Sequence, residues 1–299
     1  MRKVKASMMN AIHDLPLLVA RDEGFFRDQG LDVEIITTPG SGQKDSDHQA
    51  LRSNIFDRTM EALYEQGACD QFRMCEWGIM KRAVESNVEK GHRPAKIVAL
   101  GSAMSTFAIV TDPKAGIYEP EQLKNRPIGV SPFNGSHFTT LKLLEGFLKR
   151  EQIQTKFAGT MRERIEALKR GEVAAISLME PWISVAEKQG LRVLMESHST
   201  RSEAAGDELD GPTLHKMFLA EGEAARAIDK NPAKYAHYLV QEAGGMLELK
   251  DLKLARILNA PPEPYTKERF QHTYEWTRDW GLVPAGATYE NTVDNRAWQ

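Results

Sequence analysis

The amino-acid sequence predicts an α/β protein with mostly parallel sheets. Short apolar runs alternate along the chain with longer segments in which apolar residues recur at helical spacing. This alternation is typical of folds in which helices cover the faces of a parallel sheet. The chain has 299 residues, which is long enough for two domains of roughly 100–200 residues each.

The elements follow one another in a regular order. We expect strands at 2–8, 32–38, 95–103, 106–112, 127–131 and 173–179. We expect helices at 15–30, 57–67, 119–126, 136–153, 162–172 and 180–190. From residue 213 onward the pattern is mainly helical, and Pro and Gly separate the segments.

Composition excludes several classes of protein. The net charge is −3, with 41% hydrophobic and 27% charged residues, so nothing points to nucleic acid or to an anionic membrane. No apolar run approaches the roughly 18 residues of a membrane span. Two cysteines, Cys69 and Cys75, make no disulfide framework, which fits a reducing compartment. His13, Asp14 and Pro16 interrupt the first apolar run, so we expect no signal peptide and a cytoplasmic protein, or a periplasmic one if a leader has been removed.

Four segments together resemble the type II periplasmic-binding-protein fold. They are LPLLVARDEGFFRDQGLDVEI, TFAIVTDPKAGIYEPEQLKNRPIGVS, ALKRGEVAAISLMEPWISVAEKQG and YEWTRDWGLV. Their order and spacing are similar to the sulfonate, taurine and nitrate substrate-binding group, which also contains the thiamine-pyrimidine-synthase-like proteins. The resemblance implies two lobes joined by two crossover strands, with lobe one at 1–103 and 200–299 and lobe two at 104–199. It also implies a ligand cleft between the lobes, since open parallel sheets bind ligands at the carboxyl ends of their strands.

The turn SPFNGSHF follows an expected strand and opens a helix. Ser131, Asn134, Gly135 and Ser136 can place backbone N–H groups and hydroxyls around an anion there, and His137 can reach the ligand. The alternative is ordinary helix capping by Asn134 or Ser136. Because the family binds ligand at this turn, we expect a ligand contact.

Two further strand ends carry candidate ligand-binding residues. Glu180 and Trp182 follow the strand at 173–179, and relatives carry a similar Glu-Pro-Trp. Cys75, Glu76 and Trp77 occupy the segment where relatives cradle the ligand from lobe one. A buried Cys is usually inert, and nucleophilic reactivity would require a lowered thiol pKa.

The stretch GSGQKDSDHQALRSNIFDR is longer than an ordinary strand-to-helix connection. Its His48 and Arg58, ten residues apart, resemble the active-site loop of the sulfinate desulfinase of dibenzothiophene desulfurisation. Arg58 would clamp an anionic group and His48 would transfer a proton. The desulfinase's nucleophilic cysteine would lie in the first strand-to-helix loop, where this chain has His13. Either His13 or Cys75 substitutes for it, or the chemistry differs.

These observations leave two hypotheses. The first is a cytoplasmic enzyme of lyase or hydrolase type, desulfinase- or decarboxylase-like, that cleaves a bond in a small aromatic or heteroaromatic compound. Its catalytic residues would be His48, Arg58 and Cys75. The alternative is the substrate-binding protein of an ABC importer for sulfonate-, taurine- or nitrate-like solutes. Under either hypothesis the partner is a small organic ligand and no metal or cofactor is expected, because the histidines show no metal-ligand spacing. A thiamine-pyrimidine-synthase-like role is weaker, since the cysteine-rich cluster of those proteins is missing.

Overall fold

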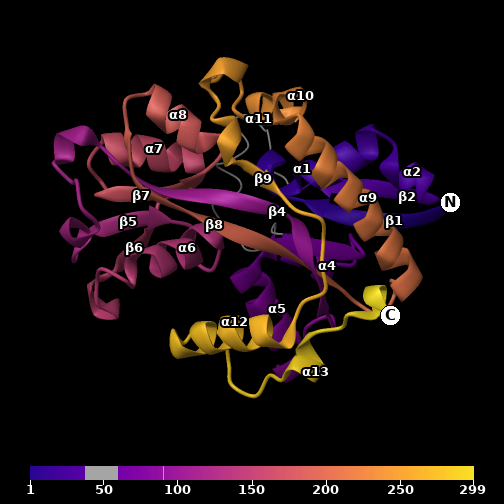
Figure 1. Cartoon of the computed structure of the whole chain (residues 1–299). Helices are drawn as coiled ribbons and strands as arrows, with labels where there is room; N and C mark the ends of the chain where they lie inside the picture. Colours follow the sequence, from indigo (N-terminus) through magenta and orange to yellow (C-terminus); the bar gives the residue numbers. More distant parts are fainter. Residues whose placement is uncertain (38–59, 90) are drawn as a thin grey trace. The chain divides into compact units, whose positions relative to one another are not determined.

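The computed structural model describes residues 1–37, 60–89 and 91–299, and these residues form two compact units. The first unit comprises Met1–Met104, Thr200–Tyr235 and Asn259–Gln299. The second unit comprises Ser105–Ser199 and Ala236–Leu258. Figure 1 shows the course of the chain.

The first unit is built on the strand order β2-β1-β3-β8. Strand β1 is parallel to both β2 and β3, whereas β3 and β8 are antiparallel. Its elements are β1 (Arg2–Met8), α1 (Ala11–Asp22), α2 (Phe25–Asp28), β2 (Leu31–Thr37), α4 (Met60–Glu65), β3 (Gln71–Cys75), α5 (Glu76–Val88), α9 (Gly211–Lys230), α10 (Pro232–Tyr235), α12 (Lys267–Asp279) and α13 (Tyr289–Thr292). A short 3-10 helix, Arg296–Trp298, ends the chain.

The second unit contains the parallel strands β6-β5-β7, and β7 pairs antiparallel with β4. Helices α6, α7 and α8 pack against β7 (Figure 1). The elements are β5 (Pro127–Val130), α6 (Gly135–Leu144), β6 (Gln154–Phe157), α7 (Met161–Lys169), β7 (Ala175–Met179), α8 (Trp182–Lys188) and α11 (His237–Glu242). Short 3-10 helices lie at Pro113–Ala115, Pro120–Leu123, Arg150–Gln152, Leu249–Asp251 and Leu254–Arg256.

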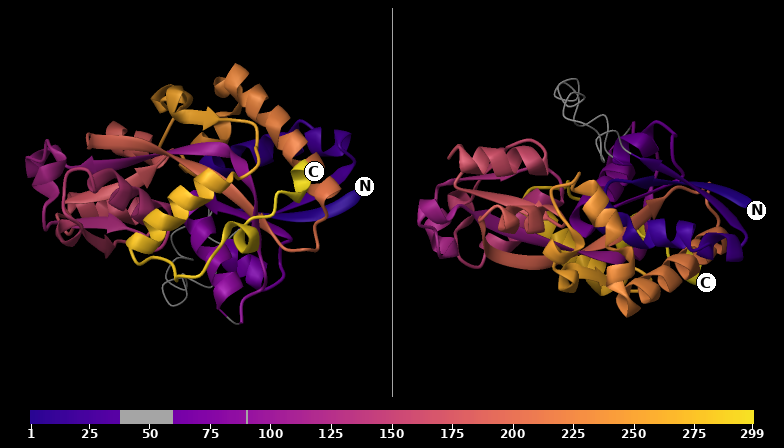
Figure 2. Two further views of the ribbon diagram at one scale, coloured as in Figure 1. Left: turned by 60° about the horizontal axis from the view of Figure 1, so that its bottom comes forward. Right: turned by 90° about the horizontal axis from the view of Figure 1, so that it is seen from above.

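Two long strands contribute residues to both units: β4 (Lys96–Thr111) and β8 (Arg192–Ala205), which can be followed in Figure 2. The short strand β9 (Ile257–Asn259) pairs with β4. The predicted fold class, two α/β lobes joined by two crossover strands, is confirmed. Several local expectations differ from the structure. Residues 95–103 and 106–112 form the single strand β4, and the helix expected at 136–153 ends at Leu144. Strands β3, β6, β8 and β9 and helix α5 were not predicted from the residue pattern, and the helix expected at 119–126 is a short 3-10 helix.

One segment belongs to a different unit from the one expected. Residues 236–258 were assigned to lobe one, but the structure groups them with the second unit. Two ion pairs join this segment to the rest of the second unit: Arg256 bonds Glu187 at 2.7 Å and Lys188 bonds Asp251 at 2.6 Å.

The topology of the first unit decides where a site can form. Strands β1 and β3 are parallel neighbours, so their carboxyl ends lie at the same edge of the sheet. Helix α1 begins three residues after β1 ends, and α5 begins immediately after β3. Behind this edge, α5 packs against α12 over an apolar core that includes Phe72, Ile79 and Phe270.

Candidate functional site

The most densely charged buried region of the described chain lies in the first unit. Five ionisable side chains, each at most 2% exposed, form what we call the ionic cluster: Asp14, Arg73, Arg201, Glu203 and Glu221. Strands β3 and β8 provide the two arginines and Glu203, while helices α1 and α9 provide the other carboxylates. Burying so many charges is costly unless they are paired, so the cluster's pairing decides what it can do.

Arg73 is the centre of the cluster. Its Nη2 lies 2.8 Å from Glu221 Oε1 and 3.1 Å from Glu203 Oε2, and its Nε lies 3.8 Å from Asp14 Oδ1. Ser102 Oγ donates a further hydrogen bond to Glu221 at 3.0 Å. Arg73 is therefore surrounded by three carboxylates, which hold its pKa above the ordinary value despite burial.

Asp14 is placed by the local geometry at the start of α1. Asn10 caps this helix by accepting the N–H of His13 at 3.0 Å, and Asp14 itself departs from helical geometry with φ −118°. The Asp14 carboxylate turns back to accept the N–H groups of Met9 and Asn10, at 2.8 and 3.2 Å. Its other oxygen accepts a hydrogen bond from Arg201 Nη2 at 3.0 Å.

Arg201 is compensated less completely than the other arginine of the cluster. Its only ion pair within the described residues is to Asp14. Its Nε and Nη1 are buried and have no hydrogen-bond partner among those residues. Burial, reinforced by Arg73, lowers the pKa of this guanidinium, and Asp14 opposes that shift. A buried cation with unused donors is a position that an anion would stabilise.

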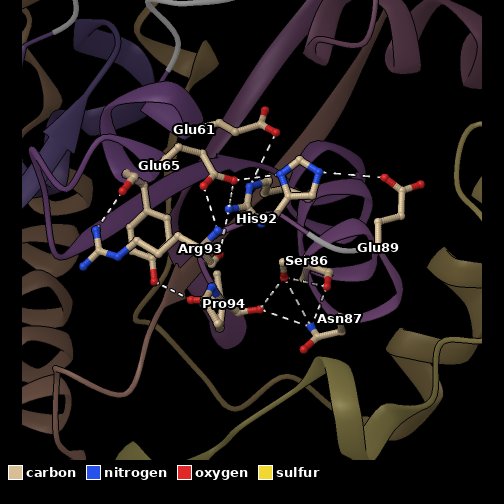
Figure 3. A network of polar contacts seen from close by, with 12 residues as sticks. Glu61, Glu65, Ser86, Asn87, Glu89, His92, Arg93 and Pro94 are labelled. Carbon is tan, nitrogen blue, oxygen red and sulfur yellow. Dashed lines mark hydrogen bonds and ion pairs between the residues drawn. The ribbon is translucent and has the colours of Figure 1, made fainter.

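Arg82 provides a useful contrast, because its Nε and Nη1 also lack hydrogen-bond partners in the described part of the chain. Two carboxylates face it, however: Glu65 bonds Nη2 and Glu61 lies 3.6 Å from Nε. Tyr64 and Phe72 also stack near the guanidinium, each ring centroid 5.9 Å away. Figure 3 shows the polar network around Glu65. Arg82 therefore has the charge compensation that Arg201 lacks.

Two groups beside Arg201 are uncharged at neutral pH. Cys75 is directly opposite Arg201 in the β3–β8 pairing, and burial raises the pKa of its thiol to about 11. Backbone N–H groups of Gly78 and Trp77 bond the sulfur, but they do not offset burial. Burial and Arg201 together lower the pKa of His13 well below 6.5. Of the three residues Arg201, Cys75 and His13, Arg201 is therefore the only one that is charged at neutral pH.

Glu203 carries the cluster's proton near neutral pH. Burial raises its pKa to about 8, and Glu221 and Asp14 add to the effect, whereas Arg73 and Arg201 oppose it. Gln71 Nε2 donates a hydrogen bond to Glu203 Oε2. With Glu203 protonated, the cluster holds two carboxylates and two guanidiniums and has no net charge.

The predicted anion-binding turn lies in the second unit, and side chains of the turn bond its own N–H groups. Ser136 Oγ accepts the N–H of Ser131 at 3.0 Å, and Asn134 Oδ1 accepts that of Gly135 at 2.6 Å. His137 Nδ1 accepts the N–H of Phe133 at 3.2 Å, which leaves the proton of the neutral ring on Nε2. These contacts are those of the capping alternative, and a ligand contact at this turn stays a prediction.

Glu76 takes part in a dense set of contacts within the first unit. Its carboxylate accepts hydrogen bonds from Tyr265 at 2.6 Å, Thr273 at 2.9 Å and Arg269 at 2.8 and 2.7 Å. The neighbouring Trp77 packs its ring 5.7 Å from that of Trp276.

Glu180 has a comparable set of partners in the second unit. It accepts hydrogen bonds from Ser184 at 3.1 Å and Arg256 at 3.1 Å, while burial raises its pKa. Trp182 begins α8 and is partly buried. The predicted ligand roles of Glu76, Trp77, Glu180 and Trp182 stay predictions.

The structure thus brings some of the predicted residues together and leaves others apart. His13 and Cys75 both lie beside Arg201 in the first unit. His48 and Arg58 lie outside the described residues. Arg73 and Arg201 were not among the predicted residues. One feature of the sequence could have identified Arg73 as a candidate: it lies inside QFRMC, where a charged residue interrupts a short apolar run.

The described ranges contain neither a metal-binding cluster nor a membrane-spanning helix. No group of three or more His, Cys, Asp or Glu side chains there is arranged to hold a metal ion. None of the helices described combines the length and the apolar character needed to cross a membrane.

Comparisons with known proteins agree with this architecture. The family described as NMT1/THI5 like matches residues 12–51. No curated protein matches the sequence. The periplasmic nitrate-binding protein NrtA of Synechocystis PCC 6803 superimposes with a TM-score of 0.74 at 14% identity, covering 100% of this chain and 87% of NrtA.

Two further solved structures are similar over nearly their whole length. The alkanesulfonate-binding protein SsuA of Xanthomonas axonopodis pv. citri, bound to MOPS, has a TM-score of 0.70 at 15% identity, with 95% of each chain covered. The desulfurization enzyme DSZB has a TM-score of 0.63 at 13% identity, covering 99% of this chain and 98% of that one. At these identities the similarity establishes the fold alone, and this fold is the one that the sequence resemblance predicted.

Proposed function

We propose that this protein binds a small organic anion and serves as the solute-binding component of an importer. The observation that carries the proposal is Arg201, a fully buried guanidinium with one carboxylate partner and two donors that the described residues leave unused. An anionic ligand would supply acceptors for these donors; because Nε and Nη1 point from opposite edges of the guanidinium, each would bond a separate acceptor atom.

The surroundings of Arg201 support binding better than covalent chemistry. Cys75 is the nearest candidate nucleophile, and a thiol whose pKa is about 11 is almost entirely protonated at neutral pH. The fold is shared with proteins that bind nitrate and alkanesulfonates. A periplasmic location would follow from this proposal.

The test is isothermal titration calorimetry with methanesulfonate, benzenesulfonate and nitrate. Arg201→Lys keeps the charge but loses the Nε and Nη1 donors, so we expect affinity to fall roughly 10- to 100-fold, as for the loss of a hydrogen bond to a charged group. Arg82→Lys is the matched control, because Arg82 is equally buried in the same unit but already has two carboxylate partners. Unchanged affinity in Arg201→Lys would remove Arg201 from the site.

The second candidate is an enzyme that cleaves a C–S or C–C bond. Its support is the similarity to DSZB, together with His48 and Arg58 at the spacing noted above. The test is mass spectrometry of aromatic sulfinates and carboxylates after incubation with the protein. Under this hypothesis product forms, and His48→Ala and Arg58→Ala abolish it; recovery of every compound unchanged would exclude it for these substrates.

A further inference from the structure

We propose that the Arg201 site selects singly charged anions over doubly charged ones, because Arg201 has two unused donors but its one carboxylate partner, Asp14, repels further negative charge. This inference rests on the proposed function and specifies the class of ligand. It concerns the same unit of the protein and requires no residue outside it.

The cluster is one connected chain of charges. Arg201 contacts Asp14 at 3.0 Å, and the same Asp14 oxygen lies 3.8 Å from Arg73. Arg73 in turn contacts Glu203 at 3.1 Å and Glu221 at 2.8 Å. With every group ionised the five side chains sum to one negative charge, so the buried cluster is neutral only when one carboxyl holds a proton.

Glu203 is the group that holds this proton. Arg73 from β3, Glu221 from α9, Asp14 from α1 and Arg201 from β8 all act on it, and burial raises its pKa to about 8. Below that pH the cluster is balanced. A bound monoanion then adds one negative charge beside a guanidinium with unused donors.

A dianion meets different conditions at the same position. The cost of removing an ion from water rises with the square of its charge, while the site offers a single incompletely paired cation. The two groups next to Arg201 supply no further positive charge, since Cys75 is a neutral thiol and His13 is neutral at physiological pH. Asp14, which already bonds Arg201, repels the additional charge.

The sharpest test changes the charge of one ligand and leaves the protein unchanged. Methyl phosphate is a monoanion at about pH 5 and a dianion at about pH 7.5, because the second pKa of such phosphates is near 6. Glu203, with a pKa of about 8, stays mostly protonated across this interval. We expect the affinity for methyl phosphate to fall at least about tenfold between these two pH values, while methanesulfonate, a monoanion throughout, changes less than about twofold.

A charge-removing variant tests the cause. Glu221→Gln keeps the shape of the side chain and removes one negative charge from the cluster without touching Arg201. We expect the ratio of sulfate to methanesulfonate affinity to rise roughly tenfold in this variant at about pH 5, where Glu203 keeps its proton because burial is the largest cause of its raised pKa. Glu65→Gln is the control, because Glu65 pairs with the buried Arg82 of the same unit and is not a member of the ionic cluster.

The outcomes separate the two proposals. If no anion binds at either pH, the proposed function fails. If methanesulfonate binds and the methyl phosphate dianion binds as tightly as its monoanion, the proposed function stands and the selectivity for single charge is wrong. The pH experiment uses the unmodified protein, so this decision does not depend on whether Glu221→Gln folds.

Discussion

Each unit of the molecule buries an arginine among carboxylates, and the two are paired to different extents. In the second unit, Arg256 bonds Glu180 at 3.1 Å, Glu187 at 2.7 Å and Glu196 at 2.8 Å. Burial lowers the pKa of this guanidinium, but Glu187 and Glu180 outweigh burial and raise it. In the first unit, Arg201 has one carboxylate partner and a lowered pKa. Full pairing at Arg256 is what a structural ion pair requires, whereas incomplete pairing at Arg201 is what a binding site can use.

The largest expected effect is on stability. Arg256→Met leaves Glu180, 1% exposed, without its cation, and removing one partner of a buried pair typically costs about 3–5 kcal/mol. Arg201→Met also takes the cation from the buried Asp14, but it removes two buried donors that have no acceptor in the described part of the chain, so we expect a smaller loss than at Arg256. Urea unfolding of both variants measures this. Equal losses would show that Arg201 is as fully compensated as Arg256 and would contradict the comparison.

The second prediction concerns the pH dependence of stability. The pKa of Glu203 is about 8 in the folded protein, whereas an ordinary Glu pKa applies in the unfolded chain, so the folded state binds the proton more tightly. Its contribution to the free energy of unfolding is therefore fully present below about pH 4 and is lost as pH rises toward 8. Glu203→Gln cannot titrate, so we expect its stability to fall less steeply than that of the unmodified protein over this interval. Parallel pH profiles from denaturant unfolding would contradict the assignment.

The sequence predicted the fold more completely than the site, and the strands show why. Strands β5 and β7 are short apolar runs, and the residue pattern therefore predicted them. The two crossover strands were predicted from the resemblance to the type II periplasmic-binding-protein fold. Strand β8 was not predicted because its residues 199–203, STRSE, are polar, although the structure buries Arg201 and Glu203 there almost completely. A strand that buries charged side chains does not show the apolar pattern by which strands are recognised. Arg201 was not predicted as a candidate for the same reason, because its burial depends on partners far away in the chain.

The smallest expected effect is on the reactivity of Cys75. It tests whether Arg201 stabilises the thiolate of Cys75 or remains available to a ligand. A guanidinium opposite a thiol lowers the thiol pKa, but burial prevails here and the pKa is about 11. In a Cys69→Ala variant, which leaves Cys75 as the single thiol, we expect iodoacetamide at pH 8.5 to react roughly a hundredfold more slowly than with free cysteine, since only the thiolate reacts. Addition of methanesulfonate should not accelerate the reaction. Labelling as fast as that of free cysteine would mean that Arg201 stabilises a thiolate, which would favour the enzyme hypothesis and remove the neutral surroundings on which selectivity for singly charged anions depends.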